Sequence, residues 1–251
     1  TTEMKIELIK NQGMDLMVIL KDSLELLNMS PKDFVDQFLM VSFSPAAVVE
    51  GPNFNFRYGR SGNLDTLCEL GSTRNFDVHE VPFVTMNLNE QDQNTICSSS
   101  MIRRYLEEGN TEYAAKMLTR PYRLIGPTVK GRGIGRKLGY PTANINPSGQ
   151  LVPAEGLYAG KVQIADTPEE LYTAPTTLPA ALSIGRAKTF LTDHPLLLEA
   201  HIIGKDYGDL YGKCLALDFI QWFRPQQRFD SEKQLIQTIE SDCQQCLQFL
   251  K

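Results

Sequence analysis

The segment KGRGIGRKLGYPTAN, residues 130–144, carries the densest chemical signal in the chain. Its three glycines, Gly131, Gly133 and Gly135, have no side chains, so backbone N–H groups can converge on an anion there. Positive charge surrounds them at Lys130, Arg132, Arg136 and Lys137. The segment therefore predicts a site for nucleotide phosphates. A flexible glycine-rich hairpin with a solvated basic tip has the same composition, and the glycines alone favour that simpler interpretation.

Two neutral oxygen donors, Thr142 and Asn144, close the same segment. Such oxygens suit Mg²⁺, which keeps several waters and takes phosphate oxygens of the substrate as further ligands. The pattern is not a Walker motif, because no Gly-Lys-Ser/Thr follows the glycines.

Short strands are predicted on both sides of this segment. Apolar runs bounded by Gly, Pro and Asp clusters lie at Leu124–Val129, Gly156–Ile164, Pro179–Ile184, Leu196–Ile203 and Leu215–Phe223. Several short strands in succession indicate an antiparallel barrel or sandwich. A final helix follows, capped by Asp230, with an apolar face formed by Leu235, Ile236, Ile239, Cys243, Cys246, Leu247 and Leu250.

The first 120 residues have a different pattern. Helices are predicted near Lys5–Asn11, Ser30–Phe38, Ser61–Leu70, Ser98–Glu108 and Thr111–Leu118, and strands at Asp15–Leu20, Ala46–Glu50 and Phe76–Phe83. This alternation indicates a Rossmann-like α/β domain with a parallel sheet, which is incomplete because no strand opens it. The net charge is −6 up to Arg120 and +1 afterwards. We therefore expect two domains, 1–120 and 121–251.

The composition excludes several classes of protein. The chain has 251 residues, is 42% hydrophobic and carries a net charge of −5, as ordinary globular proteins do. It has no apolar run of the roughly 20 residues that a membrane helix needs, and its start does not read as a secretory signal. A cytoplasmic protein is expected, without a membrane or nucleic-acid partner. The sequence leaves a homo-oligomer open.

Five cysteines do not suggest a disulfide framework. Cys243 and Cys246 form a C-x-x-C, but a zinc site would need further ligands at matching spacing. The pair lies late in an amphipathic helix, which favours ordinary packing.

From Pro121 onward the chain resembles the riboflavin kinases. Gly131-x-Gly-x-Gly-Arg-x-Leu-Gly-x-Pro-Thr-Ala-Asn144 is similar to the signature of that family, and the segments Gly156–Ala159, Ala181–Gly185, Glu199–Ile202, Asp209–Gly212, Phe223–Pro225 and Arg228–Ser231 follow in its order. The resemblance implies a small antiparallel Greek-key β-barrel with a C-terminal helix. It also implies transfer of the γ-phosphate of ATP to the terminal ribityl hydroxyl of riboflavin, which gives FMN.

The same resemblance implies roles for individual residues. Glu199 would be the base, and Thr142 and Asn144 would hold Mg²⁺. ATP would lie against Gly131, Gly133, Gly135, Arg136, Lys137, Ile202 and Tyr211. The flavin would lie against Arg224, Arg228 and Phe229.

Other interpretations of these residues stay open. Without the family, Glu199 is more simply a surface carboxylate at a strand edge, and the arginines belong to a capping cluster around Asp230. We expect His201 to serve packing alone. The chain also departs from the family pattern Asn-Ile-Gly-x-x-Pro-Thr-Phe, because Ser183–Phe190 lacks the proline.

Up to Arg120 the chain resembles the adenylyltransferase module of bacterial bifunctional riboflavin kinase/FAD synthetases. Gly51–Gly59 and Cys97–Arg103 are similar to two of its motifs. The resemblance implies a nucleotide site formed by Asn53, Ser98, Ser99, Ser100 and Arg103. A plain helix cap with a surface arginine is the alternative.

The module should open with a His-x-Gly-His segment, and His79, His194 and His201 stand in unrelated contexts. We expect an N-terminally truncated module with little or no adenylylation of FMN, taken from a bifunctional parent. The leading hypothesis is therefore a riboflavin kinase. The alternatives are a flavin-binding or regulatory protein that kept the barrel and lost catalysis, and a nucleotidyltransferase for another substrate.

Overall fold

The computed structural model describes residues 1–251 except residues 22, 57, 91, 148, 173–176 and 187–195. The departure from the family pattern at residues 187–190 therefore lies outside the described residues. By contacts, the chain divides into two compact units, Thr2–Thr85 and Met86–Lys251, with Thr1 grouped with the second. Each unit is described by itself.

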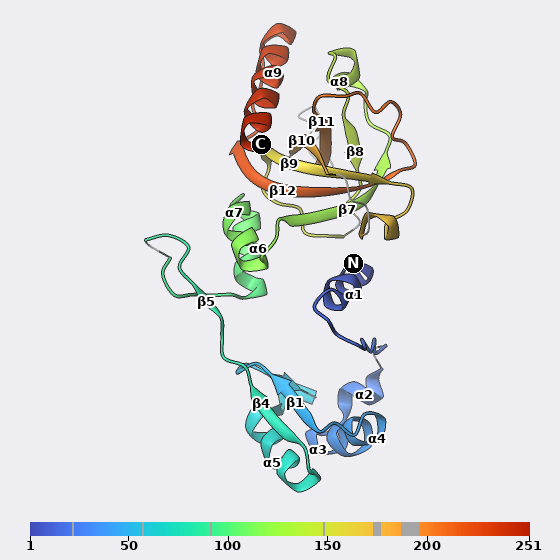
Figure 1. Ribbon diagram of the computed structural model, residues 1–251, viewed down its shortest axis with the longest axis vertical. Coiled ribbons are helices and arrows are strands. Elements are labelled where there is room, and N and C mark those ends of the chain that lie inside the picture. The colour runs from blue at the N-terminus through green and yellow to red at the C-terminus, as the bar shows by residue number, and fades with distance from the viewer. Residues whose placement is uncertain (22, 57, 91, 148, 173–176, 187–195) are drawn as a thin grey trace. The chain divides into compact units, whose positions relative to one another are not determined.

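The second unit is built around a closed barrel of six strands (Figure 1). The strands are β7 (Tyr122–Val129), β8 (Ala143–Ile145), β9 (Gly156–Ala165), β10 (Leu178–Arg186), β11 (Leu196–Ile202) and β12 (Cys214–Arg224). They pair antiparallel in the order β10-β11-β8-β7-β12-β9, and β9 closes the barrel on β10. Because β12 lies beside β9, the start of the hairpin series β9-β10-β11, this is a Greek key, as predicted.

Alternation of side chains along each strand fills the barrel. On β11, Leu198, Ala200 and Ile202 are buried in the interior cluster, whereas Glu199 and His201 between them face outward. The interior also holds Leu124, Ile145, Tyr158, Val162, Ala180, Leu182, Ile184, Leu215, Leu217 and Phe219. The residues on the outer face of β11 are therefore available to form a site.

Helix α9 (Glu232–Phe249) covers part of the outer face of the neighbouring strands β9 and β10. Two residues of this helix, Cys243 and Cys246, pack against Leu157, Ala159 and Ala181 of β9 and β10. Burial raises the pKa of the Cys243 thiol to about 11, and all five cysteines of the chain are free. The packing interpretation of the C-x-x-C agrees with this burial.

Two further helices belong to the barrel unit, α6 (Ser99–Glu107) and α7 (Thr111–Leu118). They are tied to it by hydrogen bonds from the Thr111 hydroxyl to the Ile220 carbonyl, 3.2 Å, and from the Ala154 amide to the Leu106 carbonyl, 2.9 Å. The unit also contains α8 (Ile134–Lys137), the 3₁₀ turn η3 (Glu169–Tyr172) and β6 (Thr95–Ile96), which forms a two-stranded sheet with β5 (Thr85–Met86).

The first unit is a small α/β assembly. Strands β1 (Ala47–Glu50) and β4 (Asp77–Glu80) pair in parallel, as predicted, and β2 (Asn55–Phe56) pairs with β3 (Gly62–Asn63). Val35, Phe56, Leu67 and Phe76 form its core. Its helices are α1 (Thr2–Lys10), α2 (Leu24–Asn28), α3 (Pro31–Asp33), the π-helix η1 (Phe34–Leu39), α4 (Met40–Ser42), η2 (Tyr58–Arg60) and α5 (Leu64–Arg74).

Three sequence expectations need correction. Residues 15–20 form no strand, and Leu16 is 75% exposed. The parallel strands of this unit, β1 and β4, pair with each other in a two-stranded sheet, which does not include this apolar run. Strand β8 was missed, since it has only three residues and begins at the end of the glycine-rich segment. The cap of α9 is Ser231, whose hydroxyl accepts from the Gln234 amide, while the Asp230 amide donates to the Gln234 side chain.

Candidate active site

Two pockets open on the barrel unit and share part of their lining. The first, the loop pocket, lies between the glycine-rich segment and the loop after β11, and its lining includes Gly131, Arg136, Asn144, Ile202 and Tyr211. The second, the helix pocket, lies between the outer face of the barrel and α9, and its lining includes Arg132, Gly135, Glu199, Arg224 and Phe229.

The two pockets meet at Gly133 and Thr142, which line both. A ligand in one pocket can therefore reach a ligand in the other only beside these two residues. The helix pocket has a cavity volume of about 340 Å³, within the range of sites for small organic ligands.

The glycines of the segment allow close packing as well as access for an anion. A Cβ on Gly131 would lie 2.1 Å from Nδ2 of Asn144, and a Cβ on Gly135 would lie 2.4 Å from the Tyr140 carbonyl. Both distances are far inside van der Waals contact. Gly131 and Gly135 therefore let the segment fold down onto Asn144 and onto the chain just before Thr142.

Glu199 stands at the junction, on the wall of the helix pocket. It is the antiparallel pairing partner of Asn144 across β11 and β8, and the Asn144 side chain donates a hydrogen bond to its carboxylate. Burial raises the pKa of Glu199 above its usual value, although Arg132 and Asn144 counteract part of the rise. A carboxylate with a raised pKa is a stronger base than one in water.

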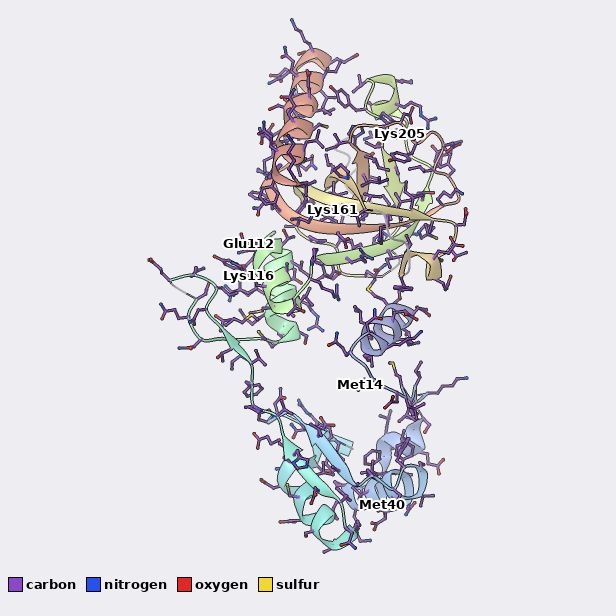
Figure 2. All side chains as sticks on the ribbon, viewed as in Figure 1. Met14, Met40, Glu112, Lys116, Lys161 and Lys205 are labelled. Atoms are coloured by element: carbon purple, nitrogen blue, oxygen red, sulfur yellow. The ribbon has the colours of Figure 1, made fainter. Side chains whose placement is uncertain are left out.

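The walls of the loop pocket are joined by hydrogen bonds. Nη2 of Arg136 donates to the Gly208 carbonyl at 3.4 Å, and the Thr128 hydroxyl donates to the Leu210 carbonyl. Lys205, in the loop after β11, also lines this pocket (Figure 2). The pocket thus combines backbone amides, cationic side chains and the half-exposed ring of Tyr211.

Comparisons with known proteins match both parts of the chain. The family model for riboflavin kinase matches residues 118–250, and that for FAD synthetase matches residues 1–100. A bifunctional riboflavin kinase/FMN adenylyltransferase of Listeria monocytogenes is 32% identical over 96% of this chain and 71% of its own length. The Bacillus subtilis protein with that name is 28% identical over 98% of this chain and 73% of its own.

The chain belongs to the riboflavin kinase family. The predicted family, fold class and class of enzyme are thereby confirmed. A Streptococcus pneumoniae crystal structure described as a macrolide-efflux protein has the same fold, with a TM-score of 0.80, 23% identity and coverage of 96% of this chain and 73% of that one.

The pockets of this kinase contain most of the residues predicted for its barrel. Gly131, Gly133, Arg136, Ile202 and Tyr211 line the loop pocket together with Thr142 and Asn144. Gly135 lines the helix pocket instead. Lys137 is exposed and lines neither of these two pockets.

The residues predicted to contact the flavin are divided. Phe229 lines the helix pocket, whereas Arg228 is exposed and outside its lining. Arg224 also lines it, but its guanidinium is bound to the buried Asp242 of α9, with Nη2–Oδ2 2.5 Å and Nε–Oδ1 3.1 Å. Arg224 therefore helps to fix α9 on the barrel.

The predicted site residues do not include three polar residues that line the helix pocket, Asp242, Gln226 and His201. Asp242 had a detectable signal, because it stands three residues after Ile239 on the apolar face of the helix. Gln226 had none; its side chain packs on Gly185 and its amide donates at 2.9 Å to both the Ser183 hydroxyl and the Ile184 carbonyl.

The residues predicted for the adenylyltransferase module lie in both units. Asn53, in the first unit, is exposed, and its carbonyl accepts from the Asn55 side chain at 2.9 Å. In the second unit, Ser98 caps α6 by accepting from the Met101 amide at 3.3 Å, and exposed Arg103 donates to the Ser99 hydroxyl at 3.4 Å. Ser100 is exposed in the first turn of α6. These contacts match the capping alternative, and a nucleotide role for the five residues stays a prediction.

Among the described residues, no helix is long and apolar enough to cross a membrane. The described part of the chain also contains no group of three His, Cys, Asp or Glu side chains that could hold a metal ion. Neutral oxygen donors near the junction are those of Thr142 and Asn144, which line the loop pocket.

Proposed function

We propose that this chain transfers the γ-phosphate of ATP to the terminal ribityl hydroxyl of riboflavin, with ATP in the loop pocket and riboflavin in the helix pocket. The observation that carries the proposal is the meeting of the two pockets at Gly133 and Thr142, beside Glu199. Donor and acceptor can approach each other there and at no other part of the two linings.

The roles of the two pockets follow from their linings. The loop pocket offers the backbone of Gly131 and Gly133 and the guanidinium of Arg136 to a polyphosphate. The helix pocket offers apolar side chains, Leu157, Leu235 and Ile239, and the ring of Phe229 to a flat aromatic ligand. An isoalloxazine ring suits the second pocket, and a nucleoside triphosphate suits the first.

In the proposed step, the carboxylate of Glu199 takes the proton of the ribityl hydroxyl. The hydroxyl oxygen forms a bond to the γ-phosphorus while the bond from that phosphorus to the β–γ bridging oxygen breaks, so that FMN and ADP result. The raised pKa of Glu199 makes it a better proton acceptor. The cation of Arg132, which lowers that pKa, keeps the carboxylate available in its ionised form.

The junction also fits Mg²⁺. Thr142 and Asn144 present neutral oxygens within one short stretch, and Gly131 leaves room for Asn144 where a Cβ would clash. Bound there, Mg²⁺ would neutralise charge on the phosphates. We also propose a cytoplasmic location, because all five cysteines are free thiols.

The test is product formation. The purified chain is incubated with riboflavin, ATP and MgCl₂, and FMN is separated and measured by its fluorescence. We expect FMN to form only when ATP and MgCl₂ are both present. Riboflavin binding without FMN would overturn the proposal and favour a flavin-binding protein that has lost catalysis.

A further inference from the structure

His201 makes a contact that packing alone does not require. It lies two residues after Glu199 on the outer face of β11 and lines the helix pocket. Its Nδ1 lies 2.8 Å from the carbonyl oxygen of Pro141. Since a carbonyl can only accept, Nδ1 carries the proton and donates. The ring of Tyr140 packs edge-on against the imidazole, with centroids 5.5 Å apart, and fixes its orientation.

This hydrogen bond lies where the backbone ladder between β11 and β8 stops. The last two pairs of the ladder are Glu199 with Asn144 and Ala200 with Ala143. Pro141 has no N–H and cannot donate a further backbone bond. The side chain of His201 therefore supplies a link between β11 and this part of the chain beyond the end of the ladder.

Thr142 is the single residue between these two attachments. On one side the ladder holds Ala143, and on the other His201 holds the carbonyl of Pro141, which belongs to the peptide group leading into Thr142. Thr142 also lines both pockets at their junction. The next hydrogen bond before Thr142 is that from the Tyr140 amide to the Gly135 carbonyl, 2.8 Å, within the glycine-rich segment itself. Loss of the His201 hydrogen bond would therefore leave the peptide group before Thr142 without its link to β11.

We propose that His201 is a positioning residue, which fixes Thr142 for binding of the metal–nucleotide complex by donating from Nδ1 to the Pro141 carbonyl. The proposal rests on the proposed function, because it takes Thr142 as a ligand to Mg²⁺. In this proposal the Nδ1–H donor of His201 holds the Pro141 carbonyl. Another side chain that places a donor at the same point could therefore replace the imidazole.

Matched substitutions separate this task from packing. In His201→Asn the side-chain amide nitrogen can take the place of Nδ1, so the donor remains although the ring is lost. In His201→Leu a side chain of comparable bulk remains without a donor. Affinity for ADP is measured by calorimetry with MgCl₂ and with EDTA, and riboflavin affinity is measured by fluorescence quenching.

We expect His201→Leu to reduce the gain in ADP affinity that Mg²⁺ provides by about 3–10-fold, as for the loss of one hydrogen bond. ADP affinity in EDTA should not change, and His201→Asn should restore most of the gain. In a Thr142→Val background, which lacks the hydroxyl, His201→Leu should have no further effect on this gain, because the two residues act through one ligand.

Several outcomes would overturn the proposal. One is an unchanged Mg²⁺-dependent gain in ADP affinity in His201→Leu. If riboflavin binding were weaker in that variant while this gain was unchanged, His201 would be a flavin contact instead. Another is an equal loss of ADP affinity in MgCl₂ and in EDTA, which would indicate a general structural role. If the unaltered chain bound ADP equally well with and without Mg²⁺, the metal site itself would fail. FMN formation by the unaltered chain tests the proposed function separately.

Discussion

The loop pocket and the helix pocket recognise ligands by different means. The lining of the loop pocket includes three glycines, Gly131, Gly133 and Gly208, and the cationic side chains of Arg136 and Lys205. The helix pocket is lined by residues of four strands (β9, β10, β11 and β12), of the glycine-rich segment and of α9, with a buried ion pair in its wall. The first arrangement suits a polyphosphate, whose charge is its main feature, and the second suits one particular ring system. The proposed phosphoryl transfer takes place where the pockets meet, at Gly133 and Thr142 beside Glu199.

The largest expected effect comes from removing the base at the junction. Glu199→Gln keeps the size of the side chain and a hydrogen-bonding partner for Asn144, but cannot accept the hydroxyl proton. We expect kcat to fall by about 10²–10⁴-fold, while riboflavin and MgADP affinities stay within about twofold. Rapid-quench assays of FMN formation would measure the rate. Unchanged turnover would show that Glu199 is not the base.

A second large effect should come from filling the space above Asn144. In Gly131→Ala the added Cβ would lie 2.1 Å from Nδ2 of Asn144, so Asn144 or the segment must move. A displacement of about 1 Å at a reacting centre can cost about 100-fold in rate. We expect a loss of that order in kcat/KM for ATP, measured at saturating riboflavin.

The same variant distinguishes the pockets. Riboflavin affinity should be retained in Gly131→Ala, because Gly131 does not line the helix pocket. An equal loss of riboflavin affinity would show that the two pockets are not separable in the way that their linings indicate.

The sequence could predict the barrel better than the site, for physical reasons. Alternation along β7, β9, β10, β11 and β12 reflects one buried face per strand, so five of the six strands were found. Strand β8 has only three residues and reads as part of a loop, because its pairing with Glu199 and Ala200 involves residues far away in the sequence. Apolar composition alone misled at residues 15–20, where no strand pairs with the run.

Candidate residues for a direct chemical role could be named from the sequence, whereas the side-chain and backbone partners that hold residues in place could not. Glu199, Thr142 and Asn144 follow from their types and spacing together with the family. Arg224 was predicted to lie against the flavin, and nothing in the sequence indicated that its guanidinium pairs with Asp242, eighteen residues later. His201 was given no role beyond packing because it is a lone histidine, and its hydrogen-bond partner, the backbone carbonyl of Pro141, cannot be recognised in a sequence.

The ion pair in the wall of the helix pocket should contribute mainly to stability. Asp242→Ala leaves the guanidinium of Arg224 largely buried and without its carboxylate, and we expect unfolding free energy to fall by about 2–4 kcal/mol. Urea denaturation followed by Trp222 fluorescence reports on the barrel unit, because this is the single tryptophan of the chain and lies in β12. Riboflavin affinity should fall as well, since α9 forms one wall of its pocket.

Glu112→Gln is the matched control for this prediction. It breaks the exposed pair between Glu112 and Lys116 on α7 (Figure 2), and exposed pairs contribute little. We expect no resolvable change in the urea midpoint. Equal destabilisation by the two substitutions would contradict a special role for the buried pair.

The smallest effect tests whether charge or position matters in the loop pocket. Arg136 and Lys137 are adjacent cations on α8, but Arg136 lines the pocket and donates to the Gly208 carbonyl of the opposite wall, whereas Lys137 does neither. We expect Arg136→Ala to raise the KM for ATP by about 5–10-fold and Lys137→Ala to change it by less than about twofold. Both are measured at saturating riboflavin and at two salt concentrations. Equal increases that disappear at high salt would mean that the segment attracts ATP by its total charge, and that the placement of Arg136 in the wall has no separate importance.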